Sequence, residues 1–137
     1  MADRGIRDRS HKAGVYFLFA ELTRRGYDVS SNDIGRNAGI PVRFAKGKDF
    51  KVICKSTDKL GQSWLVKYVK TSDRLFFVLV CAETESPFKG PIFWILSSHA
   101  MEAIYRKHMG AEERSKQMNV VPDHVSDHLG KWDILRG

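Results

Sequence analysis

Lysines recur in the stretch from Pro41 to Thr57, PVRFAKGKDFKVICKST, where they could act on a phosphate group. Two extended runs joined by a Lys46-Gly47-Lys48 turn predict a β-hairpin. Side chains alternate between the two faces of a strand, so Lys55 and Ile53 are expected on one face and Cys54 on the other. Lys55 thus ends a strand on a face that otherwise points inward, and we take it as a candidate catalytic residue.

Positive charge concentrates in the middle of the chain. The formal net charge is +7, and residues 41–74 supply nine Lys or Arg against three acids. Such a basic stretch can attract phosphate. The candidate nucleic-acid-binding residues are Arg43, Lys46, Lys48, Lys51, Lys55, Lys59, Lys67 and Lys70. The alternative is that these side chains are solvated strand edges that oppose aggregation.

Length and composition indicate one globular domain over residues 1–137, with 42% hydrophobic and 28% charged residues. Cys54 and Cys81 both lie in apolar runs, which is typical of buried thiols in a reducing compartment. Alternation points Cys54 away from Lys55, so a core role is favoured over an activated thiol. The N-terminal residues are charged, and no apolar run is long enough to span a membrane. We therefore expect a cytoplasmic protein with no membrane partner.

The elements that must position these residues follow from local patterns. The spacing predicts a helix from Ser10 to about Arg25, ended by Gly26, and a second helix over 99–108, capped by Ser97 or Ser98 and ended by Gly110. A short extended entry is expected at 27–30, and strands are expected in the hairpin, at 64–69, at 75–81 and at 92–96, while residues 111–121 are weakly patterned. A short helix opens at Pro122, and Trp132, Ile134 and Leu135 should dock on the body. The fold class is α/β: a central mixed β-sheet of about five strands flanked by helices, with a helical C-terminal tail.

The order of these elements has a recognisable form. The first helix ends in L-x-x-x-G-Y-x-V (22–29), the hairpin closes on x-x-K-[ST], and a Trp-containing strand, an apolar strand, an FWIL strand before a helix and a C-terminal W-D-x-L follow. From Lys12 to Leu135 the chain resembles the small prokaryotic members of the PD-(D/E)XK (restriction-endonuclease-like) nuclease superfamily. The resemblance implies a restriction-endonuclease-like fold.

In that family an acid from the first helix, an Asp at the start of the hairpin and a Glu or Gln two residues before the Lys surround a divalent cation. The metal polarises the phosphate and the lysine supports the nucleophile. In this chain the three ligand positions correspond to Val15, to Pro41 or its neighbour Ile40, and to Ile53. Only Lys55 matches, so it reads as a remnant. Apolar side chains cannot bind a hard cation, so we expect no metal and no cofactor.

Acids elsewhere in the chain could replace the missing ligands. Asp33, Asp49, Asp58 and Glu21 would each have to reach Lys55, and Mg²⁺ would then be the cofactor. Asp49 lies about 20 Å up the strand from Lys55 at ~3.3 Å per residue. The simpler interpretation is that the metal site has been lost.

Two further groups of residues carry alternatives. His124 and His128 are four residues apart and could hold zinc on one helix face, but a third ligand is not evident and a solvated helix end is favoured. Tyr16, Trp64 and Tyr68, with nearby lysines, could form a stacking surface for bases. Alternation instead favours Trp64 as a core residue.

Three functional hypotheses follow. The first is a catalytically inactive nuclease-fold protein that binds nucleic acid or acts as an accessory subunit in a prokaryotic DNA-processing or defence system. The second is an active Mg²⁺-dependent DNA endonuclease with a relocated acidic ligand. The third is a protein-interaction module or homodimer whose basic residues serve solubility.

Overall fold

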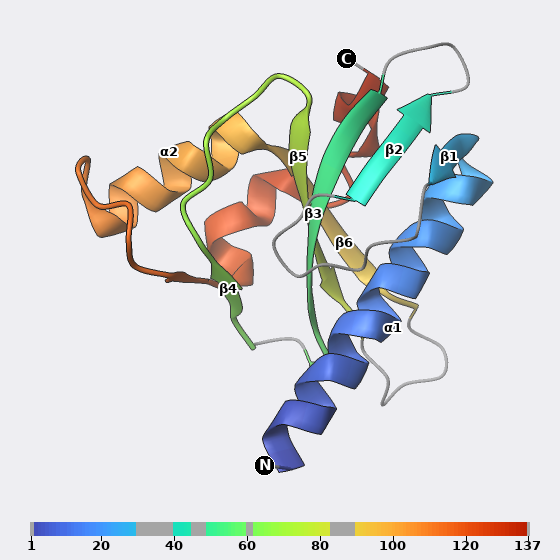
Figure 1. Ribbon diagram of the computed structural model, residues 1–137, viewed down its shortest axis with the longest axis horizontal. Helices are drawn as coiled ribbons and strands as arrows, with labels where there is room; N and C mark the ends of the chain where they lie inside the picture. Colours follow the sequence, from blue (N-terminus) through green and yellow to red (C-terminus); the bar gives the residue numbers. More distant parts are fainter. Residues whose placement is uncertain (1, 30–39, 45–48, 60–61, 83–89, 137) are drawn as a thin grey trace.

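The computed structural model describes residues 2–29, 40–44, 49–59, 62–82 and 90–136 of the chain. It has an α/β architecture in which helices α1 (Ala2–Arg24) and α2 (Ser98–Met109) lie on opposite sides of a β-sheet (Figure 1). The two sides are called here the α1 side and the α2 side of the sheet.

The central sheet is mixed and has five strands in the order β1-β2-β3-β5-β6. These strands are β1 (Tyr27–Val29), β2 (Ile40–Phe44), β3 (Asp49–Thr57), β5 (Leu75–Cys81) and β6 (Ile92–Ser97). The predicted hairpin is confirmed, because β2 and β3 pair antiparallel, and its Lys46–Lys48 turn lies outside the described residues. β3 and β5 pair in parallel, and the other neighbours pair antiparallel.

A second, two-stranded sheet covers part of the α2 side. It pairs β4 (Trp64–Val66) antiparallel with β7 (Met118–Val120). The strand predicted over 64–69 is therefore too long, because the chain leaves it after Val66 to reach α2. The strand at 118–120 was not predicted at all.

Helix α1 begins at Ala2, so the predicted start at Ser10 is wrong. The residues before Ser10 include Ala and Arg, which have high helix propensity, and a serine inside a helix costs only tenths of a kcal/mol. The predicted end is correct. Gly26 adopts φ +91°, a left-handed conformation that glycine accepts without strain, and its N–H donates to the carbonyl of Thr23 at 3.0 Å.

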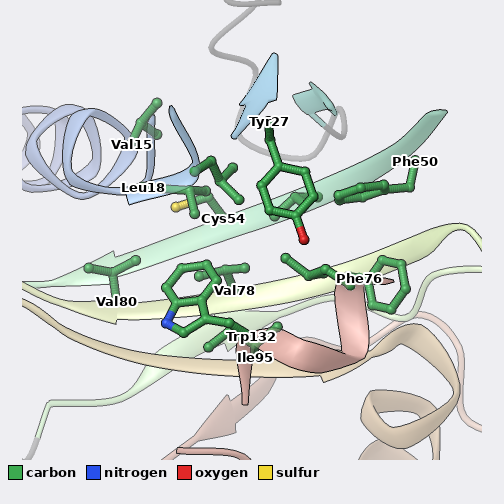
Figure 2. Close-up of a cluster of buried hydrophobic side chains, with 13 residues drawn as sticks. Val15, Leu18, Tyr27, Phe50, Cys54, Phe76, Val78, Val80, Ile95 and Trp132 are labelled. Atoms are coloured by element: carbon green, nitrogen blue, oxygen red, sulfur yellow. The ribbon is translucent and has the colours of Figure 1, made fainter. Parts of the chain in front are cut away.

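One hydrophobic core fills the α1 side. Figure 2 shows Val15 and Leu18 of α1 facing the sheet, with the Cys54 side chain pointing toward the helix. Every second residue of β3 and β5 enters this core. The buried members are Val15, Leu18, Leu22, Tyr27, Phe50, Val52, Cys54, Phe76, Val78, Val80, Ile95, Trp132 and Leu135. The predicted docking of the C-terminal residues is confirmed, since Trp132 and Leu135 lie in 3₁₀ helix η2 (Trp132–Arg136) and are buried.

A separate core fills the α2 side. The intervening residues of the same strands enter it, together with α2 and the second sheet. Its buried members are Ile53, Trp64, Val66, Phe77, Leu79, Cys81, Trp94, Leu96, Met101, Tyr105, Met118, Val120 and Val125. Val125 comes from η1 (Pro122–His128), the short helix predicted to open at Pro122, which is a 3₁₀ helix.

The termini of α2 match the prediction. The Ser97 hydroxyl accepts a hydrogen bond from the Ala100 N–H at 3.0 Å, and Gly110 ends the helix at φ +99°. Ser98 does not cap the helix. Its hydroxyl accepts the Ser72 N–H at 3.0 Å and donates to the Ser72 carbonyl at 2.8 Å, which fastens the segment between β4 and β5 to the start of α2.

Candidate functional site

Val15 and Ile53, two of the residues that the expected nuclease resemblance matched to metal ligands, lie on opposite sides of the sheet. Val15 is completely buried in the α1-side core, and Ile53 is 4% exposed in the α2-side core. The predicted alternation along β3 is confirmed, since Cys54 shares the core of Val15 and Ile53 does not. A carboxylate at each of these two positions would enter a different apolar environment.

Lys55 lies between Cys54 and Ser56 near the end of β3 and is half-buried. In the parallel ladder it stands opposite Leu79 of β5, another residue of the α2-side core. Burial raises the pKa of the neighbouring Cys54 thiol to about 12, against a small opposing effect of the Lys55 charge. Cys54 is therefore a neutral core thiol at physiological pH, as predicted.

The acids proposed as replacement ligands lie in unfavourable places. Glu21 is bound at the end of α1 by Arg24 (2.7 Å) and Arg25 (2.9 Å). Burial opposes ionisation of Glu21, but these two arginines outweigh it and hold its pKa below the ordinary value. Asp49 is exposed at the opposite end of β3 from Lys55. Asp33 lies outside the described residues.

Asp58 follows β3 directly, and the Gln62 side chain binds the backbone there. The Gln62 side-chain oxygen accepts the backbone N–H groups of Asp58 and Lys59, both at 3.1 Å. Within the described ranges, no group of three His, Cys, Asp or Glu side chains is arranged to hold a metal ion.

The described basic candidates gather on the α2 side of the sheet or on the segments that cover it. Lys51 is exposed on the same face of β3 as Ile53, and its N–H donates to the Arg74 carbonyl at 2.8 Å. Lys59 is exposed after β3, and Lys67 and Lys70 are exposed on the segment that follows β4. Figure 1 shows this segment passing over α2 before it enters β5.

For the three remaining basic candidates, the structure describes only the backbone of one. Arg43 lies in β2, opposite Asp49 of β3 in the antiparallel register. Lys46 and Lys48 lie outside the described residues.

A cluster that the sequence did not indicate lies on this same side. The half-buried Tyr68 ring meets Tyr105 edge-on, with 5.8 Å between centroids. The guanidinium carbons of Arg106 and Arg114 lie 5.6 Å and 5.4 Å from the Tyr68 centroid. Cation–π contacts of this length attract both arginines to the ring. The only feature of the sequence that could have indicated this cluster is the occurrence of aromatic residues among basic ones. That feature does not identify Arg106 and Arg114, because both are distant from Tyr68 in the sequence.

The predicted stacking surface of Tyr16, Trp64 and Tyr68 is not assembled. Tyr16 is 59% exposed on α1, on the other side of the sheet from Tyr68. Trp64 is buried against Trp94, and its indole N–H donates to the Val80 carbonyl at 3.1 Å. The core interpretation of Trp64 is confirmed.

The histidines do not form the pair of His124 and His128 that the zinc alternative requires. His124 packs on His108 of α2 rather than on His128, with 4.3 Å between ring centroids. Its Nδ1 accepts the Val121 N–H at 3.1 Å, so the neutral ring carries its proton on Nε2. Burial first, and then the neighbouring His108 and Lys107, lower the pKa of His124, while Asp123 acts in the opposite direction.

A scan against protein-family models and a search of the curated proteins found no match for this chain. None of the helices in the described ranges is long and apolar enough to cross a membrane.

Proposed function

We propose that this protein is a catalytically inactive, restriction-endonuclease-like domain that binds nucleic acid through the α2 side of its sheet. The observation that carries the proposal is the burial of Val15 and Ile53 in two different cores. A metal-dependent nuclease needs carboxylates that converge on one cation. Here the corresponding side chains are apolar and point into cores on opposite sides of the sheet. We therefore propose a nuclease-like fold that has lost the metal chemistry.

Charge supports binding on the α2 side. Lys51, Lys67 and Lys70 are exposed there, and Arg74 is exposed beside Lys51. Lysine and arginine side chains that neutralise phosphates release counterions, and this release makes the affinity depend steeply on salt. Such a surface would let the protein hold DNA or RNA by itself, or as an accessory subunit of a DNA-processing or defence system.

The test has a cleavage arm and a binding arm. Incubation with DNA and Mg²⁺ or Mn²⁺ should leave the DNA intact, while a fluorescently labelled duplex should bind with an affinity that falls as salt rises. Cleavage that Lys55→Ala abolishes would overturn the inactive assignment and establish the active endonuclease.

A matched pair of variants locates the surface. Lys67→Ala/Lys70→Ala should reduce the slope of log K against log salt by about 2, because two phosphate contacts are lost. Lys12→Ala/Lys131→Ala removes the same charge from exposed positions on α1 and beside η2, and should leave the slope unchanged. If the wild-type protein shows no salt-sensitive binding, nucleic-acid binding is wrong, and a defined oligomer in light scattering would favour the interaction module.

A further inference from the structure

We infer that Arg114 is a phosphate clamp: its guanidinium binds a phosphate of the nucleic acid and is oriented for this by the ring of Tyr68. This inference rests on the proposed function. The sequence did not single out Arg114, which lies after α2 and outside the basic stretch of residues 41–74. Three properties of the cluster lead to this role: how firmly Tyr68 is held, which hydrogen-bond donors are already used, and which charges lie nearby.

Tyr68 is a fixed support. It packs edge-on against the fully buried Tyr105, and its segment is fastened to α2 by the reciprocal hydrogen bonds of Ser72 and Ser98. Its hydroxyl lies 3.5 Å from a carboxylate oxygen of Glu102. A guanidinium that stacks on a fixed ring loses less conformational freedom when it binds a ligand than one on a freely moving side chain.

The two arginines at this ring differ in what their N–H groups do. Arg106 uses its donors inside the protein: Nε donates to Glu102 at 3.2 Å, and a terminal nitrogen donates to the Ala111 carbonyl. Arg114 is exposed, and no residue in the described ranges accepts a hydrogen bond from its guanidinium. The fork of donors in an arginine matches two oxygens of a phosphate. Arg106 therefore serves the structure, and Arg114 remains available to a ligand.

The neighbouring charges favour an anion. Lys67, Lys70 and Lys116 are exposed on the same segments as Tyr68 and Arg114. Glu113 adjoins Arg114, but its Oε1 accepts the Ser115 N–H (2.8 Å), the Ser115 hydroxyl (2.7 Å) and the Lys116 N–H (3.2 Å). These hydrogen bonds hold the Glu113 carboxylate within its own turn. Glu112 and, on the Tyr68 segment, Asp73 are exposed acids that reduce the local positive charge, and Glu102 is engaged by Arg106.

The experiment compares Arg114→Ala, Arg114→Lys and Lys116→Ala in binding of the labelled duplex over a salt titration. Arg114→Ala should weaken binding about tenfold at low salt, because a bidentate charge-assisted contact is lost, and should reduce the salt slope by about 1. Arg114→Lys keeps the charge and the slope but lacks the fork, so it should recover only part of the affinity. Lys116→Ala removes a neighbouring exposed charge without a ring beneath it, and should weaken binding about twofold. Equal losses for Arg114→Ala and Lys116→Ala would overturn the clamp.

Tyr68 provides a second readout. Tyr68→Phe keeps the ring but loses the hydroxyl that lies near Glu102, so it should retain most of the affinity, whereas Tyr68→Leu should resemble Arg114→Lys. If Tyr68→Leu unfolds, the comparison of the Arg114 variants still decides the matter. If Lys67→Ala/Lys70→Ala impairs binding and the Arg114 variants do not, only the clamp fails. If the wild type does not bind in a salt-sensitive way, the proposed function fails with it.

Inorganic phosphate separates the two sources of the ligand group. A clamp for nucleic acid should bind the duplex in the presence of millimolar phosphate, because the other basic residues contribute to a longer ligand. Complete displacement of the duplex by millimolar phosphate would assign Arg114 to a small anion and overturn the assignment to nucleic acid.

Discussion

Gly14 of α1 lies directly against Ser56 of β3. A β-carbon built on Gly14 would be 2.2 Å from Ser56 Oγ and 2.3 Å from Ser56 Cβ. Real β-carbons do not approach other atoms so closely, so helix and strand can pack at this distance only while residue 14 has no side chain. Gly14 is next to Val15, and the close contact therefore helps to set the position of Val15 in the α1-side core.

Gly14→Ala should destabilise the protein by about 2 kcal/mol, the usual cost of overpacking a core. At an unhindered position within a helix the same change would stabilise by up to ~1 kcal/mol, so the sign identifies the contact. Urea denaturation would measure the free energy of unfolding. Gly90→Ala, outside the helices, is a control for the loss of backbone freedom alone, because no atom of the described residues lies within 4 Å of a β-carbon at that position. Adding Ser56→Gly to Gly14→Ala removes the clashing atoms and should restore part of the loss.

A carboxylate introduced at Ile53, which the proposed nuclease resemblance matches to a metal ligand, should cost stability rather than create a metal site. Ile53→Glu places a charge in a core position that is 4% exposed, and we expect a loss of ~3 kcal/mol or more. Leu65→Glu, at a position 48% exposed on β4, should be nearly neutral. Thermal unfolding with and without Mn²⁺ measures both effects. Stabilisation of the Ile53→Glu variant by Mn²⁺ would contradict the proposal that the metal site is lost.

Cys54 should not react with thiol reagents in the folded state. Burial raises its pKa to about 12, so the reactive thiolate is nearly absent at pH 8, and reagents also cannot reach a buried sulfur. Alkylation followed by mass spectrometry of peptides should show Cys54 unmodified, and modified once guanidinium is added. A Ser126→Cys variant supplies an exposed thiol that should react within the same time. Fast labelling of Cys54 in the native protein would refute its place in the core.

Acid should loosen the contact between η1 and α2 through His124. Burial and the nearby His108 place its pKa below the ordinary 6.5, so near that pH the unfolded chain binds more protons than the native one. This contribution to stability is complete above pH 6.5 and is lost as the pH falls below it. Protonation also puts a hydrogen on Nδ1, which then cannot accept the Val121 N–H.

Two variants isolate this effect in urea denaturation between pH 5 and 8. His124→Asn keeps a side-chain acceptor for the Val121 N–H without a titrating group, and should flatten the loss of stability at low pH. His108→Asn removes a neighbouring positive charge and should raise the pKa of His124 toward its ordinary value, as measured by NMR. A His124 pKa above 6.5 in the wild type would show that the packing differs from that described.

The elements that are encoded locally were predictable from the sequence. Strand β5 is an unbroken apolar run because both of its faces are buried, and Gly26 and Gly110 end helices for reasons that involve only a few neighbouring residues. The alternation of side chains along β3 was likewise sufficient to assign Ile53 and Cys54 to opposite faces of the sheet. The helical start of α1 was missed because a capping residue, Ser10, is also tolerated inside a helix.

What the sequence could not indicate depends on contacts between distant segments. Strand β7 has only three residues, with no pattern of its own, and forms because Trp64 and Val66 of β4 offer it a partner. The arginines at Tyr68 come from α2 and from the segment after it, so their convergence requires the fold. The local periodicity of a sequence contains no information about contacts between residues that are distant in the chain.

The position of Trp132 has a consequence for the order of events during synthesis. Its ring packs in the α1-side core and carries the Arg25 guanidinium 4.8 Å from its centroid, so the residue that follows α1 meets a residue of η2. During translation, α1 and the central strands leave the ribosome before Trp132 and Leu135 exist, and the apolar surface that these residues cover stays open until then. A nascent chain of this protein should therefore need protection from aggregation until Trp132 and Leu135 cover that surface.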